Sequence, residues 1–285
     1  MASLKSIRKR ISSVKSTQKI TKAMKMVAAA KLRRAQFRAI EARAYTQAAM
    51  QMAGRAAVRA GVEAHPLFRT GSVQTPKELW ILSSDRGLCG GFNSNLLRRA
   101  GDFLEKGPVQ CRVVGKKGRD FFRARGWKTE EVLTGFYDNL DAESLRKKAE
   151  EIAARFASGQ TGEVWIAYNR FQSAMVQVVT FEKLLPLSAG GAQEKKAPVG
   201  VDYLYEPERF QVLDWLCKEA LTAALRQALF ESQAAELAAR MTAMESATSN
   251  ASDMISYLTL QYNRVRQATI TRELMDIVGG AEALS

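Results

Sequence analysis

The sequence of 285 residues lacks the features that mark several large classes of protein. It has no apolar run of about 18 residues and no apolar N-terminal segment, so we expect neither a transmembrane span nor a secretory signal. Cys89, Cys111 and Cys217 are far apart and form no CxxC pair, which indicates a reduced compartment. The single histidine, His65, argues against a histidine-based metal site or catalytic triad. We therefore expect no metal and no cofactor.

Acidic residues are missing from the first forty positions. The segment from Met1 to Ile40 holds twelve Lys and Arg residues and no Asp or Glu, within a chain of net charge +14. Such an imbalance indicates an acidic partner: nucleic acid, anionic lipid or an acidic protein surface. A solvated charged face, phosphate neutralisation on a nucleic acid and an acidic protein surface moving past the helix all remain open interpretations.

Glycine and proline are absent from residues 213–269, where apolar side chains recur at alternating steps of three and four. This spacing of 3.5 residues, free of charge at every position, is typical of a left-handed coiled-coil seam. A helix of this length would span about 85 Å. The seam positions are Leu213, Leu216, Ala220, Ala223, Gln227, Phe230, Ala234, Leu237, Met241, Met244, Thr248, Ala251, Ile255, Leu258, Tyr262, Val265 and Thr269.

The other end of the chain repeats the rhythm, from Leu4 through Ile7, Ile11 and Val14 to Ala60. Two matched seams at opposite ends of one chain predict an antiparallel pair of helices, with the middle of the chain as a separate domain. Alanine dominates the first seam and buries little apolar area, so a lone pair of helices would be marginal. We therefore expect further structure to surround it.

The middle of the chain alternates between β-rich and helical segments. Strand candidates at 78–83, 109–115 and 132–133 alternate with helix candidates at 94–106, 116–125 and 141–158, and a hairpin is expected over 164–184. This order predicts a small α/β sheet with parallel pairs. The fold class is a mixture of α/β and α+β: a long antiparallel two-helix coiled coil with an inserted small, Rossmann-like α/β domain. The expected divisions are shaft helices at 1–60 and 207–285, the second starting at Pro207, and a globular domain at 61–206.

The loop Ser84–Asn93 contains three glycines but fits neither common phosphate-binding motif. The glycines more simply permit a tight turn from strand to helix, and Cys89 has no visible catalytic partner. After Thr269 the apolar positions shift to Ile270, Leu274, Ile277 and Ala281, so we expect the end of the last helix to project without a partner helix.

Four segments closely resemble the gamma subunit of the rotary ATP synthases, and together they cover both helices and the domain between them. They are ITRELMDIVGGA at 270–281, TQKITKAMKMVAA at 17–29, SDRGLCGGFN at 84–93 and MESAT at 244–248. The resemblance implies a noncatalytic central rotor shaft inside a hexamer of alternating alpha and beta subunits, coupling transmembrane proton flow to ATP synthesis or hydrolysis. It implies a peripheral membrane protein on the cytoplasmic face of the bacterial plasma membrane. The paired-cysteine insertion of chloroplast relatives is missing between Gly190 and Gly200, so thiol regulation is not expected.

The resemblance also implies particular contact residues. Lys22, Met24 and Lys25 would face an acidic lever segment of beta, and four residues of the last helix would meet a catch loop of beta: Arg266, Gln267, Thr271 and Glu273. Tyr203, Tyr205 and Glu206 would contact the epsilon subunit and the membrane rotor ring, and no nucleic acid is expected as a partner. The alternative from another class is a basic coiled-coil protein associated with nucleic acid, and an enzyme built on the glycine-rich loop is a third.

Overall fold

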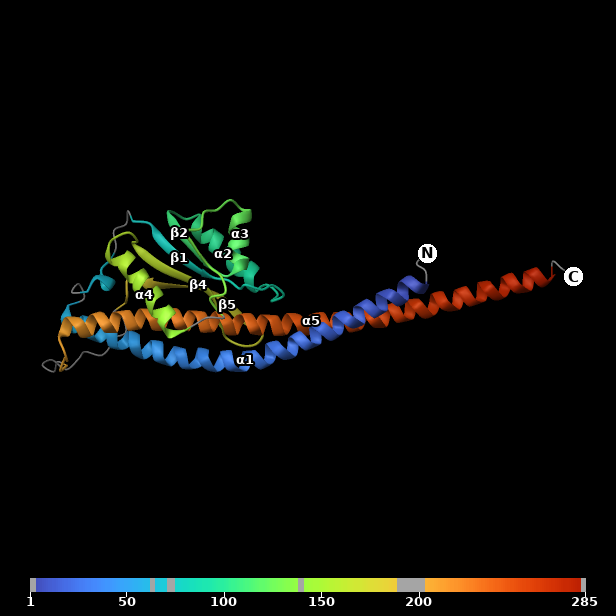
Figure 1. Ribbon diagram of the computed structural model, residues 1–285, viewed down its shortest axis with the longest axis horizontal. Helices are drawn as coiled ribbons and strands as arrows, with labels where there is room; N and C mark the ends of the chain where they lie inside the picture. Colours follow the sequence, from blue (N-terminus) through green and yellow to red (C-terminus); the bar gives the residue numbers. More distant parts are fainter. Residues whose placement is uncertain (1–3, 62–64, 71–74, 138–140, 189–202, 283–285) are drawn as a thin grey trace. The chain divides into compact units, whose positions relative to one another are not determined.

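The computed structural model describes residues 4–61, 65–70, 75–137, 141–188 and 203–282. The first and last elements of the chain are two long helices, α1 (Leu4–Ala60) and α5 (Arg209–Glu282) (Figure 1). Between them lie the short 3-10 helix η2 and an alternation of strands and helices. These are η2 (Pro66–Phe68), β1 (Lys77–Leu82), α2 (Phe92–Leu104), β2 (Val109–Val114), α3 (Lys116–Ala124), β3 (Glu131–Leu133), α4 (Ala142–Ala157), β4 (Glu163–Phe171) and β5 (Gln177–Leu185).

The contacts divide the chain into two compact units, and the division cuts through both long helices. The first unit joins the chain up to Ala28 with the chain from Met241 onward, and the second runs from Ala29 to Arg240. Residues 190–200, where the paired-cysteine insertion of chloroplast relatives is missing, lie outside the described residues.

In the first unit α1 and α5 run antiparallel. The Lys25 ammonium lies 2.6 Å from Glu245, and the hydroxyls of Thr248 and Thr21 are hydrogen-bonded at 2.8 Å. Between residues 248 and 270 of α5, the side chains that are not exposed are those of the predicted seam: Thr248, Ala251, Ile255, Leu258, Tyr262, Val265 and Thr269. The antiparallel coil predicted from the spacing is therefore confirmed.

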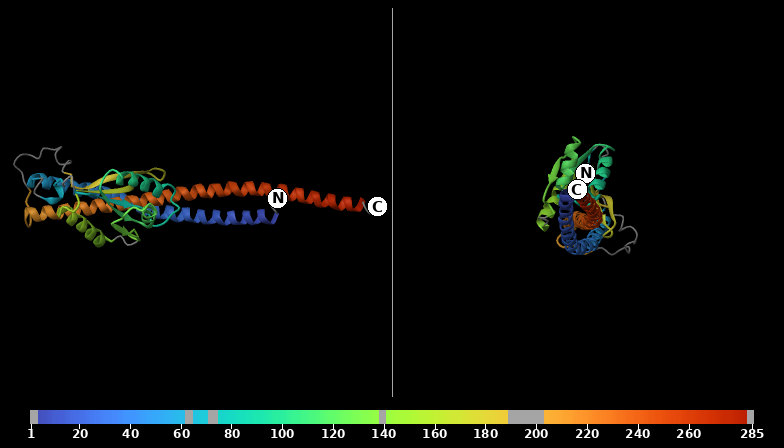
Figure 2. Two further views of the ribbon diagram at one scale, coloured as in Figure 1. Left: turned by 90° about the horizontal axis from the view of Figure 1, so that it is seen from above. Right: turned by 90° about the vertical axis from the view of Figure 1, so that its right-hand side faces the viewer.

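The end of α5 extends past the beginning of α1 (Figures 1 and 2). Because the two helices are antiparallel, the register of the two contacts places Leu4 near Val265. Beyond that level Leu274, Ile277 and Val278 are 57–68% exposed. The projecting helix end predicted from the phase shift is present within this unit.

The second unit contains a five-stranded sheet in the order β3-β2-β1-β4-β5. The pairs β1–β2, β1–β4 and β2–β3 are parallel, and the hairpin β4–β5 is antiparallel, as the sequence predicted. Asp141 caps α4, because its carboxylate accepts a hydrogen bond of 2.6 Å from the Ser144 amide.

Both faces of the sheet are covered. Side chains of β1 alternate between two buried clusters: Leu79 and Ile81 pack with α2 and α3, whereas Trp80 and Leu82 pack with α4 and α5. Residues 213–229 of α5 supply Leu213, Cys217, Leu221, Leu225, Ala228 and Leu229 to the second cluster. This contact supplies the surrounding structure that the alanine-rich α1 seam requires.

Several boundaries differ from the prediction by one or two residues: α2, for example, was expected at 94–106 and spans Phe92–Leu104. Helix α5 begins at Arg209 and not at Pro207, because the first i to i−4 hydrogen bond, at 3.0 Å, runs from the amide of Val212 to the carbonyl of Glu208. None of the described helices is apolar over a length that would cross a membrane.

Candidate partner-binding surfaces

The first candidate surface is the outer side of α1 in the first unit. Lys22 is exposed, Met24 is half-buried, and the apolar side chains of Met26 and Val27 are 60% and 56% exposed. Lys25 differs from its neighbours, since its charge is paired with Glu245 across the seam. This surface therefore offers positive charge beside apolar side chains and carries no acid of its own on α1.

The second candidate surface is the projecting end of α5. Arg266, Gln267, Thr271 and Glu273 are all exposed, and the Thr271 hydroxyl donates to the Gln267 carbonyl one turn earlier. These polar residues share the end of the helix with exposed apolar side chains, namely Ile270, Leu274, Met275, Ile277 and Val278. The structure thus brings the four predicted residues together on a helix end that extends beyond Leu4, the first described residue of α1.

The third candidate surface precedes α5 in the second unit. The rings of Tyr203 and Tyr205 lie edge to face, 6.2 Å apart. The Arg59 guanidinium lies 3.9 Å from the centre of the Tyr203 ring, and the Arg209 guanidinium lies 5.0 Å from that of Tyr205. Glu206 and Leu204 are exposed, Leu204 at 90%. The arginines hold the two tyrosines by cation–π contact while the surface remains open.

The glycine-rich loop at residues 84–93, by contrast, uses its polar groups in hydrogen bonds within the protein. Asp85 accepts hydrogen bonds from the amides of Lys116 and Gly135, both at 3.0 Å, which ties the loop to the start of α3 and the end of β3. Gly90 has a φ of 55°, the left-handed conformation that glycine adopts without strain. Burial raises the pKa of the Cys89 thiol, so this residue is poorly suited to act as a nucleophile.

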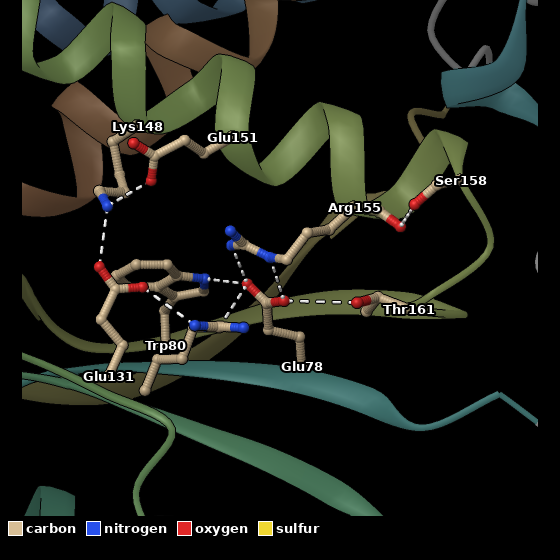
Figure 3. A network of polar contacts seen from close by, with 9 residues as sticks. Glu78, Trp80, Glu131, Lys148, Glu151, Arg155, Ser158 and Thr161 are labelled. Carbon is tan, nitrogen blue, oxygen red and sulfur yellow. Dashed lines mark hydrogen bonds and ion pairs between the residues drawn. The ribbon is translucent and has the colours of Figure 1, made fainter.

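Figure 3 shows a polar network that the sequence did not reveal. The fully buried Glu78 of β1 accepts hydrogen bonds from Arg155 of α4 at 2.8 and 3.1 Å and from the Trp80 indole at 2.6 Å, and Arg112 of β2 lies 3.1 Å away. Burial favours the neutral acid, but the hydrogen bonds and charges of the two arginines hold the Glu78 pKa below its ordinary value. The network fastens α4 to the sheet.

A second ion pair that was missed joins Arg43 of α1 to Glu231 of α5, with 2.6 Å between Nε and Oε1. Each residue is adjacent to a seam position, where charges usually face solvent. The sequence does contain one indication that Glu231 is buried. Cys217, Leu221, Leu225 and the alanines after them form a second apolar stripe on α5. A helix buried on two sides leaves little solvent for Glu231, so a cationic partner was required.

Among the described residues, no group of three or more His, Cys, Asp or Glu side chains is arranged to hold a metal ion.

Residues 3–284 of the sequence match a family model described as ATP synthase. The ATP synthase gamma chain of Anaeromyxobacter sp. strain Fw109-5 is 47% identical over the whole of both chains. That of Chlorobium phaeobacteroides strain BS1 is 41% identical over all of this chain and 99% of its own.

Solved structures of ATP synthases contain chains of similar fold. A chain of the central stalk and c-ring of the Tetrahymena thermophila mitochondrial ATP synthase is 26% identical and aligns with a TM-score of 0.60, covering 80% of this chain and 99% of its own. A chain of the Euglena gracilis mitochondrial ATP synthase, in a structure of its OSCP, F1 and c-ring, shares the fold. Its TM-score is 0.68 at 20% identity, over 99% of this chain and 94% of its own.

The antiparallel coil with its inserted α/β domain therefore defines a central-stalk protein of the rotary ATP synthase class. The chain belongs to the ATP synthase gamma chain family. It is a noncatalytic central shaft subunit, which confirms the function that the resemblance implied. The comparisons give no support to the nucleic-acid alternative.

Proposed function

We propose that this chain turns inside a hexamer of three alpha and three beta subunits, one shaft per hexamer, and couples transmembrane proton flow to ATP synthesis or hydrolysis. The observation that carries the proposal is the projecting end of α5. Ile270, Leu274 and Ile277 expose 47–68% of their surface at a helix end that no other described residue of its unit covers. Burying such a side chain stabilises a complex by roughly 1.5–3 kcal/mol, which supplies a reason for the end to enter a sleeve of partner subunits.

The hexamer contacts follow from the two surfaces at this end. Lys22 and Met24, with Lys25 beside them, face the acidic lever segment of beta, because α1 carries no acid before Glu41. A catch loop of beta meets the polar group on α5, formed by Arg266, Gln267, Thr271 and Glu273. Their exposure and their spacing over two helical turns support this assignment.

The domain between the two shaft helices in sequence serves as the foot. Residues 1–60 and 207–285 act as shaft and residues 61–206 as the globular foot. Tyr203, Tyr205 and Glu206 contact the epsilon subunit and the membrane rotor ring. The exposed positions of Tyr203 and Glu206, on either side of the exposed Leu204, support this assignment. In this arrangement the chain is a peripheral protein of the cytoplasmic face of the bacterial plasma membrane.

Co-expression with the alpha and beta subunits of the same organism tests the proposal. Native mass spectrometry should give one copy of this chain with three alpha–beta pairs, and replacing Ile270, Leu274 and Ile277 together by Ser should reduce recovery of that complex. Met175→Ser, at a side chain 84% exposed after β4, is the matched control and should leave recovery unchanged. A complex with another stoichiometry, or full recovery of the triple variant, would contradict the proposal.

A further inference from the structure

One side chain of α1 connects three elements of the second unit. The Arg43 Nε lies 2.6 Å from Oε1 of Glu231 on α5, and its Nη2 donates a hydrogen bond of 2.6 Å to the backbone carbonyl of Phe171 at the end of β4. A single planar guanidinium therefore links the first shaft helix, the second shaft helix and the sheet of the foot.

The Arg43–Glu231 pair is not arranged in a way that would maximise the stability of the fold. Glu231 is fully buried, and although its Oε1 also accepts from the Gln227 amide at 3.3 Å, its Oε2 has no hydrogen-bond partner among the described residues. The nearby hydroxyl of Tyr168 on β4 is likewise buried. The Arg43 side chain is 42% exposed, so the cost falls on Glu231: burying a carboxylate with an unsatisfied oxygen costs free energy that an apolar side chain of similar size avoids.

The next residue of α5 is held from a different direction. The Ser232 hydroxyl donates to the Leu82 carbonyl at the end of β1, at 3.3 Å, and lies 3.2 Å from the hydroxyl of Tyr137. Consecutive residues of a helix point about 100° apart around its axis. Contacts on Glu231 and Ser232 therefore restrain α5 against rotation about its own axis, and not only against separation from α1.

On the N-terminal side of Arg43 the α1 seam offers little resistance of its own to such rotation, whereas one turn later the Thr46 hydroxyl donates a hydrogen bond of 3.0 Å to the Ala223 carbonyl of α5. Ala35, Ala39 and Ala42 fill the α1 seam here, and alanine knobs are too small to fix the register of two helices. A single polar or charged residue at a helix interface is a recognised means of fixing register, at some expense in stability.

We propose that Arg43 and Glu231 form a torque clamp: they are positioning residues that fix the rotational register of α1, α5 and β4, so that torque applied at the foot passes to both shaft helices. The function of the clamp rests on the shaft role proposed above, whereas its existence is a property of the isolated chain. Arginine suits the position because its fork reaches two acceptors in different directions, which a lysine ammonium on a flexible stem does not reproduce.

The first experiment uses the full isolated chain. Nitroxides at Phe37 on α1 and Met175 after β4, both exposed, report the distance between helix and sheet, and the three native cysteines are buried and remain unlabelled. In the double variant Arg43→Met with Glu231→Met the distance distribution should broaden while the melting temperature stays the same or rises. Arg43→Lys should broaden it less. The control Lys183→Met with Glu163→Met, an ion pair between β5 and β4, should leave it unchanged.

The second experiment measures protons pumped per ATP hydrolysed by the assembled complex in inverted membranes. The double methionine variant should pump at least twofold fewer protons per ATP with assembly intact, and the control pair should match the wild type. An unbroadened distance distribution overturns the clamp itself. A broadened distribution with an unchanged pumping ratio overturns its role in torque. Failure of the wild-type chain to assemble would count against the proposed function alone, since the distance measurement still decides whether the clamp exists.

Discussion

The Lys25 ammonium of α1 lies 2.6 Å from the Glu245 carboxylate of α5, and this contact crosses the coiled-coil seam. The side chains are 37% and 58% exposed, so water screens their attraction. Lys25 occupies a seam position that would ordinarily be apolar. The contact shows how the coil tolerates a charge there: the stem crosses the seam, and the ammonium reaches an acid at its edge.

Lys25→Gln should lower the free energy of unfolding of the isolated chain by only about 0.2–1 kcal/mol at low salt. The loss should shrink at about 1 M salt, where exposed charges are screened within about 3 Å. Thermal melts followed by circular dichroism, with the exposed Lys15→Gln as control, measure both effects. A loss of the same size in high salt would mean that Lys25 acts through packing and not through charge.

The amides of residues 270–278 should exchange rapidly with solvent in the free chain and become protected on assembly. These turns extend beyond α1 and expose their apolar side chains, so only their own hydrogen bonds stabilise them. Hydrogen exchange read by mass spectrometry on the free chain and on the complex is the measurement. Peptides from residues 213–229, within the buried cluster, should be protected in both states. Slow exchange of 270–278 without partners would refute this expectation.

Glu78→Gln should destabilise the second unit by about 3–5 kcal/mol, because it leaves two arginines near a neutral buried group. Urea unfolding followed by tryptophan fluorescence reports the loss, since the Trp80 indole donates to Glu78. Glu130→Gln, in an exposed pair with Lys128, is the control and should cost less than about 1 kcal/mol. Similar losses in the two variants would show that the network of Figure 3 contributes no more than a surface pair.

Much of the fold could be predicted because it depends on local periodicity. A spacing of 3.5 residues identifies the seam even where Thr21 and Thr248 occupy it, since these hydroxyls pair with each other. The ion pairs could not be predicted. Arg43 and Glu231 are 188 residues apart, and their contact depends on three elements meeting at one point. The burial of Glu78, at the start of a strand, could not be predicted either, because its arginine partners come from later segments.

The partner surfaces were predicted for a different reason. Arg266, Gln267 and Thr271 were identified by family motif, and the structure adds only that they are exposed on one helix end. Nothing in a single chain specifies which atoms of another subunit they meet. The start of α5 was misplaced by two residues because proline favours the first turn of a helix but does not require it.

The contribution of Glu163 to stability should depend on pH in a defined window. Burial alone would raise its pKa, but hydrogen bonds from Lys183, Trp165 and Lys77 lower the pKa from 4.5 to about 2. Because the folded value is the lower one, the stabilisation is complete above pH 4.5 and is lost as the pH falls toward 2. The difference in unfolding free energy between wild type and Glu163→Gln should therefore shrink between pH 6 and pH 3.

The size of that change has an upper limit. Lowering a pKa by one on folding corresponds to ~1.4 kcal/mol of stability, and solvent screening reduces this value at the partly exposed Glu163 carboxylate. Urea unfolding of the two proteins at several pH values between 6 and 3 is the measurement. A difference that is constant over this range would contradict the assignment.

The exposed basic side chains of α1 should act together in coupling. Lys22, Lys31 and Arg33 are all exposed, and each contact with an acidic collar is worth only ~0.2–1 kcal/mol, so single replacements should be mild. Replacing all three by Gln keeps the helix, because Gln is a comparable helix former, and leaves the apolar end of α5 intact for assembly.

The triple variant should therefore assemble but pump fewer protons per ATP hydrolysed in inverted membranes, and higher salt should lower the wild-type ratio in the same direction. A second triple variant removes the same charge from exposed positions of the foot: Arg98, Lys106 and Lys147 to Gln. This control should leave the ratio unchanged, because the net charge of the chain falls equally in both variants and only the position of the charge differs. Equal ratios for the two variants, with no response to salt, would mean that the basic side of α1 is only a solvated face.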